Sequence, residues 1–187
     1  NTWLLQTAAG SALGRMVIRL AKMQGFRTIN VVRRREQVKE LFDLGASAVI
    51  CTADESIDER VKELTSGEGV SYAIDAVGGE AGTAALRALG PEGHMLCYGT
   101  LSGEPISFDA RHLMSGHRRV EGFWLSNWIR QQNILTMLSL FRSINQLLAQ
   151  GTVGTEIGTS FKLDEIQQAV KAAEEPGRKG KVLLKMT

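Results

Sequence analysis

The sequence predicts an α/β protein built on a doubly wound, parallel, six-stranded sheet. Short runs rich in Val, Ile and Ala alternate with segments of helical period, which is the pattern of βα repeats. Glycines close several of the helical segments, and a turn of small residues follows the first apolar run. The six strands are expected at 3–7, 27–32, 46–51, 70–79 with its turn, 94–99 and 118–125.

Helical segments separate these strands, and their apolar residues recur at intervals of three or four positions. We expect a first helix that ends at Gly25, a second over 36–44, a third over 57–67 and a small fourth that ends at 89–93. Each helix therefore presents one apolar stripe with which it can cover the sheet.

The chain after the sixth strand reads differently. A long helix is expected over 129–149, and its predicted inner side consists of Ile134, Leu135, Leu138, Phe141, Ile144 and Leu148. A strand at 155–161, a helix over 163–175 capped by Asp164, a turn at 176–180 and a strand at 181–186 follow. We place a domain boundary near residue 150, so that 1–150 form one domain and 151–187 a separate segment.

Composition and charge narrow the class of protein. The chain has 187 residues, 43% of them hydrophobic and 22% charged, with a net charge of +2. These values are ordinary for a globular domain and indicate neither nucleic acid nor an anionic membrane as a partner. Cys51 and Cys97 each end an apolar run, which predicts reduced core thiols. No metal is expected, because His94, His112 and His117 have no metal-ligand spacing.

The turn after the first strand is a candidate phosphate-binding turn. Its residues are Gly10, Ser11, Ala12, Leu13 and Gly14. Of the G-x-G-x-x-G pattern over 9–14, only the last glycine is in place, and small residues at such a turn also serve plain packing. Ala and Ser still let the backbone approach a phosphate, and the helix that follows would supply N–H groups and a positive dipole end.

Three arginines follow the second strand. Arg33, Arg34 and Arg35 lie about where an NAD-binding fold carries an acidic residue for the ribose 2′-hydroxyl. Guanidinium groups would instead bind a 2′-phosphate, so the pattern favours NADPH over NADH. The alternative is a solvated basic cap, which the positive end of the next helix dipole would make mildly unfavourable.

These residues carry a family resemblance over nearly the whole chain. The stretch "TAAGSALGRMVIRLAKMQGFRTINVVRRR" resembles the Rossmann-type coenzyme domain of the medium-chain dehydrogenase/reductase superfamily, whose turn is A-x-x-[GS]-x-x-G. "GFRTINVVRRR" and "EGFWLSNW" resemble the mitochondrial-type trans-2-enoyl-thioester reductases, and "GKVLLKM" is similar to the superfamily's C-terminus. Relatives among the quinone oxidoreductases share much of the rest.

The resemblance implies a zinc-free NADPH oxidoreductase that transfers hydride to a polarised double bond. By the same resemblance, residues 11–14 hold the pyrophosphate and the Arg33 region holds the 2′-phosphate. It also places a further set of residues near the nicotinamide: Gly99, Thr100, Phe123, Trp124, Leu125, Ser126 and Lys181. Without the family, Phe123 and Trp124 read as core aromatics near an edge strand.

The family also carries a GroES-like domain with a catalytic tyrosine before the coenzyme domain, and neither Tyr72 nor Tyr98 matches that tyrosine. The chain begins inside a strand-like run, so we expect a piece of a longer protein, with 151–187 belonging to the other domain. We therefore expect cofactor binding, little turnover, and no catalytic residue in this chain.

Two other functions are compatible with the sequence. One is a quinone or aldehyde reductase of the same superfamily, and another is a module that senses NADPH without chemistry. A methyltransferase is disfavoured because the ribose of S-adenosylmethionine is usually bound by an acidic residue at the position where this chain has Arg33. A serine hydrolase is disfavoured because "GSALG" does not match the G-x-S-x-G motif. The expected partners are an enoyl thioester or quinone and a second copy of the chain, paired through the edge strand near Val120. The expected location is intracellular, in the cytoplasm or, if the source is eukaryotic, the mitochondrial matrix.

Overall fold

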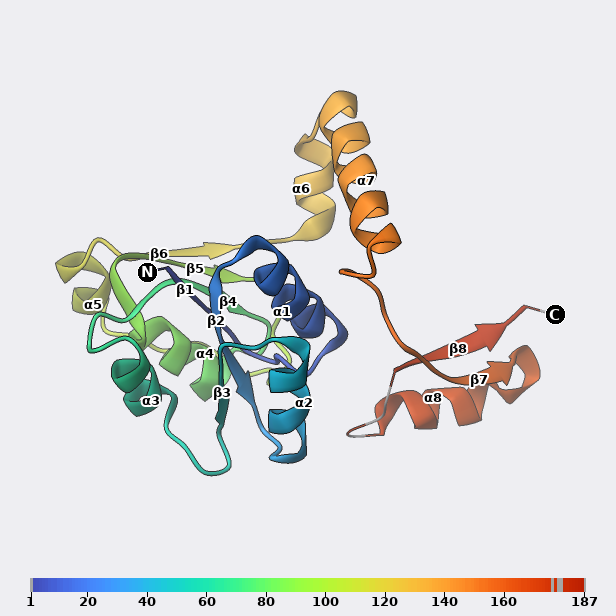
Figure 1. Ribbon diagram of the computed structural model, residues 1–187, viewed down its shortest axis with the longest axis horizontal. Coiled ribbons are helices and arrows are strands. Elements are labelled where there is room, and N and C mark those ends of the chain that lie inside the picture. Colours follow the sequence, from blue (N-terminus) through green and yellow to red (C-terminus); the bar gives the residue numbers. More distant parts are fainter. Residues whose placement is uncertain (1, 176, 178–179, 187) are drawn as a thin grey trace.

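The computed structural model describes residues 2–175, 177 and 180–186 (Figure 1). Six strands form one sheet in the order β3-β2-β1-β4-β5-β6, and every neighbouring pair is parallel. The strands are β1 (Trp3–Gln6), β2 (Arg27–Val32), β3 (Ala48–Cys51), β4 (Val70–Asp75), β5 (Leu89–Cys97) and β6 (Arg119–Gly122). This is the doubly wound order, with its reversal between β1 and β4, and the predicted fold class is confirmed.

Helices cover both faces of this sheet. Helices α1 (Ala12–Gln24) and α2 (Glu36–Leu44) lie on one side, and α3 (Ile57–Leu64) and α4 (Gly79–Arg87) lie on the other (Figure 1). As predicted, α1 and α2 end at glycines: Gly25 and Gly45 have φ of 77° and 109°, the left-handed region that residues with a Cβ avoid. A short helix, α5 (Ala110–Ser115), was not predicted from the sequence.

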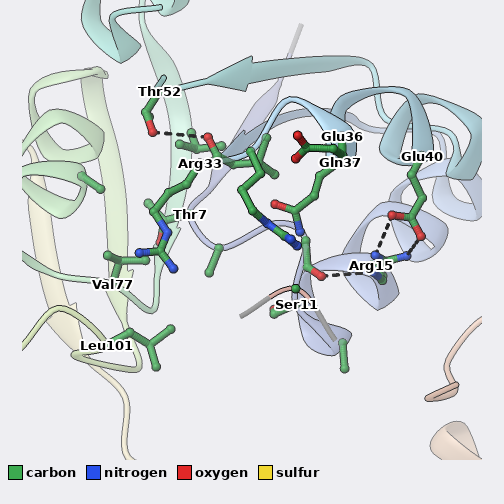
Figure 2. A pocket seen from close by; sticks show the side chains of 18 of the residues that line it. Thr7, Ser11, Arg15, Arg33, Glu36, Gln37, Glu40, Thr52, Val77 and Leu101 are labelled. Carbon is green, nitrogen blue, oxygen red and sulfur yellow. Dashed lines mark hydrogen bonds and ion pairs between the residues drawn. The ribbon is translucent and has the colours of Figure 1, made fainter. Parts of the chain in front are cut away.

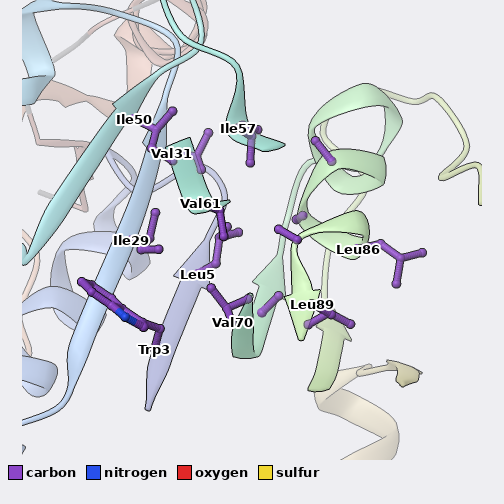
Figure 3. Packing of buried hydrophobic residues seen from close by; sticks show 14 of the residues in the cluster. Trp3, Leu5, Ile29, Val31, Ile50, Ile57, Val61, Val70, Leu86 and Leu89 are labelled. Carbon is purple, nitrogen blue, oxygen red and sulfur yellow. The ribbon is translucent and has the colours of Figure 1, made fainter. Parts of the chain in front are cut away.

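Buried apolar residues form one cluster on each side of the sheet. The larger cluster packs strand residues such as Leu5 and Ile29 against Val61 of α3 and Leu86 of α4 (Figure 3). The smaller one packs Ile18 of α1 and Leu41 of α2 onto the opposite face. At the centre of that second face the strands carry polar side chains, and Gln6, Thr28 and Asn30 are all completely buried.

Several predicted boundaries are wrong. The sixth strand, expected over 118–125, ends at Gly122, and Leu125 already begins helix α6. Strand β5 begins at Leu89 rather than at residue 94, because Leu89 pairs with Val70 of β4. The two backbones approach closely here: a Cβ on Gly90 would lie 2.3 Å from the Glu68 carbonyl oxygen. The predicted helix over 129–149 is two helices, α6 (Leu125–Gln131) and α7 (Ile134–Ala149). Asn133 separates them by capping α7, its side chain accepting from the Thr136 amide at 2.9 Å.

The predicted inner side of α7 is also wrong. No residue of this helix is buried, and Ile134 and Phe141 are 75% and 56% exposed. Helices α6 and α7 form a hairpin that projects from the end of β6 rather than lying on the sheet (Figure 1). A period of 3.6 shows which apolar residues share a face, whereas only the packed structure shows whether anything covers that face.

The last elements form a two-stranded parallel sheet with one helix. Strands β7 (Ile157–Lys162) and β8 (Lys181–Lys185) pair, and α8 (Ile166–Glu174) connects them after a single 3-10 turn over Leu163–Glu165. The start of this turn is capped by Glu165, which accepts from the Lys162 amide at 2.7 Å, and not by Asp164 as predicted. Part of the turn at 176–180 lies outside the described residues. No helix in the described ranges has the length and apolar character needed to cross a membrane.

Candidate nucleotide-binding site

A crevice with a volume of about 1600 Å³ lies beyond the carboxyl ends of the central strands. Its walls include Ser11 in the first turn, Arg33 after β2, Val77 after β4 and Leu101 after β5 (Figure 2). Lys181 of β8 lines it from the C-terminal unit. The crevice therefore sits at the reversal of strand order, which is where doubly wound sheets bind nucleotides.

The N-terminus of α1 opens into this crevice. Ser11 caps the helix by accepting a hydrogen bond from the Gly14 amide at 3.1 Å, and the Ser11 amide donates to Ala8 O. Within the described part of the chain, the amides of Ala12 and Leu13 have no acceptor. Two such N–H groups at the positive end of a helix make a site for an anion, and the hydroxyl proton of Ser11 can add a third donor.

Gly14 is required by close packing. A Cβ at this position would lie 2.5 Å from Ala9 O and 2.6 Å from Ala9 Cα, so the helix could not stay against the turn. At Gly10, a Cβ would lie 2.0 Å from Gln37 Nε2, which shows that the Gln37 side chain of α2 rests on the turn. Sequence patterns indicated Gly14 but not Gln37, since nothing local marks a side chain that contacts a turn 27 positions earlier.

Substitution of Gly14 by alanine should lower the free energy of unfolding by about 1–3 kcal/mol, the usual cost of overpacking. Chemical denaturation monitored by circular dichroism measures this. Gly154→Ala is the control, because a Cβ there meets nothing within 4 Å and its φ is not positive. Equal stability of the two variants would show that α1 can move away from the turn without cost.

The three arginines after β2 differ in their surroundings. Arg33 and Arg34 line the crevice and, within the described residues, make no side-chain hydrogen bond or ion pair. Arg35 lies outside the crevice wall and pairs with Asp54, and this pairing raises the pKa of its guanidinium. Of these three arginines, two therefore line the crevice without an ion-pair partner among the described residues, and the third is paired outside its wall.

A fourth arginine, not singled out from the sequence as a site residue, holds the turn itself. Arg15 Nε donates to Gly10 O at 3.1 Å, and its guanidinium forms a two-pronged ion pair with Glu40 of α2 (Figure 2). The hydrogen bond with Glu40 raises the pKa of Arg15 above its ordinary value. This pairing joins the first turn of α1 to the middle of α2, which makes Arg15 a support for the turn at 10–14.

The turn after β4 is held by a completely buried carboxylate. Asp75 Oδ1 accepts from the Thr7 hydroxyl at 2.5 Å and from the Val77 amide at 3.1 Å, and Oδ2 accepts from the Gly78 amide at 2.8 Å. The Thr7 hydroxyl oxygen in turn accepts from the Ala76 amide at 3.0 Å. This network connects the ends of β1 and β4 across the crevice floor.

The residues expected near the nicotinamide lie mostly outside the crevice wall. Gly99 packs on the turn after β4, since a Cβ there would lie 2.8 Å from Ala76 O, and Thr100 follows it, but Leu101 and Ser102 line the crevice instead. Burial and the Asp75 charge raise the pKa of the neighbouring Cys97 thiol and Tyr98 hydroxyl, so both stay protonated at neutral pH.

The aromatic segment after β6 lies further away. The Phe123 amide donates to Cys97 O at 2.7 Å, so Phe123 sits beside the end of β5, and its ring lies 6.3 Å from that of Trp128. Trp124 and Leu125 are 72% and 59% exposed, and Ser126 is exposed as well. Trp124 is therefore not the core aromatic that the sequence alone suggested.

Metal-binding groups do not gather in this part of the molecule. Across the described residues, no group of three or more His, Cys, Asp or Glu side chains is placed to hold a metal ion. Cys51 and Cys97 are both free thiols, Cys51 buried and Cys97 half-buried.

Fold and crevice together define a dinucleotide-binding domain, and comparison with known families assigns it. The chain belongs to the zinc-binding dehydrogenase family, whose model matches residues 12–143. It is thus a coenzyme-binding domain of the medium-chain dehydrogenase/reductase superfamily, as the resemblance implied.

Individual relatives fall into two groups. The mitochondrial enoyl-[acyl-carrier-protein] reductase of Rattus norvegicus is 30% identical over 177 residues, which cover 92% of this chain and 48% of the relative. A Bacillus thuringiensis protein assigned as an NADPH:quinone reductase superposes with a TM-score of 0.90 at 32% identity, covering 97% of this chain and 55% of its own. The mitochondrial 2-enoyl thioester reductase heterodimer of Candida tropicalis shares the fold, with a TM-score of 0.82 at 23% identity, covering 97% of this chain and 54% of its own. The chain spans about half the length of the curated relatives it matches.

Proposed function

We propose that this chain is the NADPH-binding domain of a zinc-independent oxidoreductase that transfers hydride to the activated double bond of a 2-enoyl thioester. One observation carries the cofactor assignment: Arg33 and Arg34, which have no ion-pair partner among the described residues, line the same crevice as Ser11 and Ala12. These two residues lie at the N-terminus of α1, where the amides of Ala12 and Leu13 have no acceptor among the described residues. NADP carries a pyrophosphate and a ribose 2′-phosphate. The amides at a helix N-terminus can bind the pyrophosphate, and the guanidinium groups can bind the 2′-phosphate.

The cofactor residues follow from this assignment. Gly10, Ser11, Ala12, Leu13 and Gly14 would form the pyrophosphate turn. Arg33 and Arg34 would hold the 2′-phosphate, and Arg35, paired with Asp54, would contribute long-range charge only. Lys181, which lines the crevice, and the segments 99–100 after β5 and 123–126 after β6 would complete the site after the rest of the protein packs on them.

The reaction follows from the relatives rather than from this domain. NADPH would supply the hydride, and the residues of this chain would bind and orient it. Enoyl thioesters are the first choice of substrate because the matching curated relatives are enoyl-[acyl-carrier-protein] reductases. A quinone or aldehyde reductase is the second choice, favoured by the similarity to the Bacillus thuringiensis protein, and an NADPH-sensing module is the third.

Titration of the chain with NADPH and then NADH, followed by nicotinamide fluorescence, tests the cofactor assignment. We expect NADPH to bind about tenfold to a hundredfold more tightly, the value of one charge-assisted phosphate contact. Equal affinities would remove the role given to the arginines, and no binding of either nucleotide would contradict the assignment itself.

The substrate is tested separately. Absorbance of NADPH at its nicotinamide band would be followed with crotonyl-CoA and with a quinone, for this chain and for the longer protein that carries it. We expect little turnover by the chain alone and enoyl-thioester reduction by the longer protein. Turnover of the chain alone at the rate of the longer protein would show that its catalytic groups lie within these residues.

We also propose a homodimer formed through β6. This strand lies at the edge of the sheet, all four of its residues are exposed, and unpaired strand edges pair readily. The substitution Val120→Asp should convert the dimer to a monomer in gel filtration with light scattering, because it opposes like charges across a two-fold contact. Val170→Asp on α8 changes another exposed valine, away from β6, and should leave the dimer intact. A wild-type chain that is already monomeric would contradict the proposal.

Two further proposals concern organisation and location. We propose that residues 1–150 are the cofactor domain and that 151–187 pack with the other half of the protein, supported by the separate pairing of β7 with β8. An intracellular location is proposed, in the mitochondrial matrix if the source is eukaryotic. It is supported by the relatives named as mitochondrial enzymes.

A further inference from the structure

Two buried amide side chains lie between α1 and the sheet. Gln6 of β1 and Asn30 of β2 are register partners, and both are completely inaccessible to solvent. Gln6 Nε2 donates to Asn30 Oδ1 at 2.7 Å and to the Gly14 carbonyl oxygen at 3.0 Å. Asn30 Nδ2 donates to Ala48 O at 2.8 Å and to Thr28 Oγ1 at 2.9 Å. The two amides thus join one helix and three strands.

Stability does not account for this pair. Burial of a polar group is costly unless all of its atoms are hydrogen-bonded, and within the described residues Gln6 Oε1 has no partner. On the same face of the sheet, Thr28 is also polar and buried, whereas Val32 and Val49 are apolar and pack in the cluster below α1 and α2. An aliphatic pair would fill the space beneath α1 without the unpaired oxygen.

The contacts of the pair point to a role in geometry. Gly14 belongs to the first turn of α1, directly after the unbonded amides of Ala12 and Leu13. Asn30 lies in strand β2, three residues before Arg33, which directly follows the end of that strand. One short chain of hydrogen bonds, from Gly14 through Gln6 to Asn30, therefore connects the N-terminus of α1, where Ser11 and Ala12 line the crevice, with the strand that leads to Arg33 and Arg34.

We propose that Gln6 is a positioning residue which, through Asn30, sets the distance between the pyrophosphate amides of α1 and the 2′-phosphate arginines after β2. The inference rests on the proposed binding of NADPH. Both phosphate groups belong to one covalent ligand, so NADPH binds tightly only when the two subsites are held at the right separation. NADH lacks the 2′-phosphate and can follow a displaced helix, so it depends less on that separation.

The test is the substitution Gln6→Met, which keeps the length of the side chain and removes both donated hydrogen bonds. Its matched control is Thr28→Val, which removes one buried hydrogen bond to Asn30 and leaves the link to Gly14 in place. We expect Gln6→Met to raise the Kd of NADPH about tenfold, the value of one misplaced charge-assisted contact. The Kd of NADH should rise much less, so the preference for NADPH falls, and Thr28→Val should retain the wild-type preference.

The outcomes separate the inference from the proposed function. A wild-type chain that binds neither nucleotide overturns both. A wild-type preference for NADPH that Gln6→Met leaves unchanged, or that Thr28→Val reduces equally, overturns only the positioning role. Thermal melting confirms that each variant is folded. If Gln6→Met does not fold, Gln6→Asn replaces it, because its amide is one methylene too short to reach both Gly14 O and Asn30 Oδ1, and the same loss of preference is expected.

Discussion

Replacement of both Arg33 and Arg34 by alanine is expected to raise the Kd of NADPH about a hundredfold while that of NADH changes by less than about twofold. Both guanidinium groups face the crevice without a carboxylate partner among the described residues, so their charge is available to a ligand. A charge-assisted contact contributes about 1.5–3 kcal/mol to binding, and the value is near the lower limit for exposed side chains. The loss of two such contacts therefore costs about 3 kcal/mol, which corresponds to a change in Kd of about a hundredfold. Fluorescence titration of the two nucleotides measures both constants.

Arg35→Ala is the matched control for this experiment. The residue adjoins Arg34 in sequence, carries the same charge and already pairs with Asp54 outside the crevice wall. Its loss should change the Kd of NADPH by no more than about twofold, because a distant exposed charge is screened by solvent. If Arg35→Ala weakened NADPH as much as the double variant, the preference would come from overall positive charge and not from two defined contacts.

Substitution of Asp75 by asparagine should lower the free energy of unfolding by about 2–4 kcal/mol. The buried carboxylate accepts from one hydroxyl and two backbone amides, whereas an asparagine side chain would turn an NH₂ group toward one of those donors. Loss of hydrogen bonds to a buried charged group, with donors left unsatisfied, is among the larger single-residue effects. Urea unfolding followed by circular dichroism provides the measurement.

A second Asp→Asn change isolates the effect of burial. Asp109 caps the exposed helix α5, where its carboxylate accepts from the Arg111 amide at 2.9 Å. Asparagine caps a helix as well as aspartate does, so Asp109→Asn should leave the unfolding midpoint almost unchanged. A small effect at both positions would mean that the turn over Val77 and Gly78 reorganises around the amide, and that Asp75 does not hold it.

Local patterns in the sequence determined the elements and their order. Alternation of apolar runs with amphipathic segments specifies the strands and helices, and glycines at the left-handed positions 25 and 45 specify where α1 and α2 end. Right-handed crossovers then leave few ways to arrange parallel strands, so the doubly wound sheet follows from the sequence. The turn at 10–14 and the arginines after β2 were found for the same reason, since each lies at a fixed place in a βα repeat.

Contacts between distant segments were decided only by the tertiary structure. Nothing local marks Asp75 as the partner of Thr7 or Gln6 as the partner of Gly14, because these pairs form when separate strands and helices come together. The three arginines are equivalent in sequence, but Asp54 lies beside Arg35 and pairs with it, whereas Arg33 and Arg34 have no ion-pair partner among the described residues. Helix α7 is the opposite case. Its apolar stripe can be read from the sequence, but the sequence does not show whether another element covers that stripe. Burial requires two surfaces in contact, and the period of a helix describes only one of them.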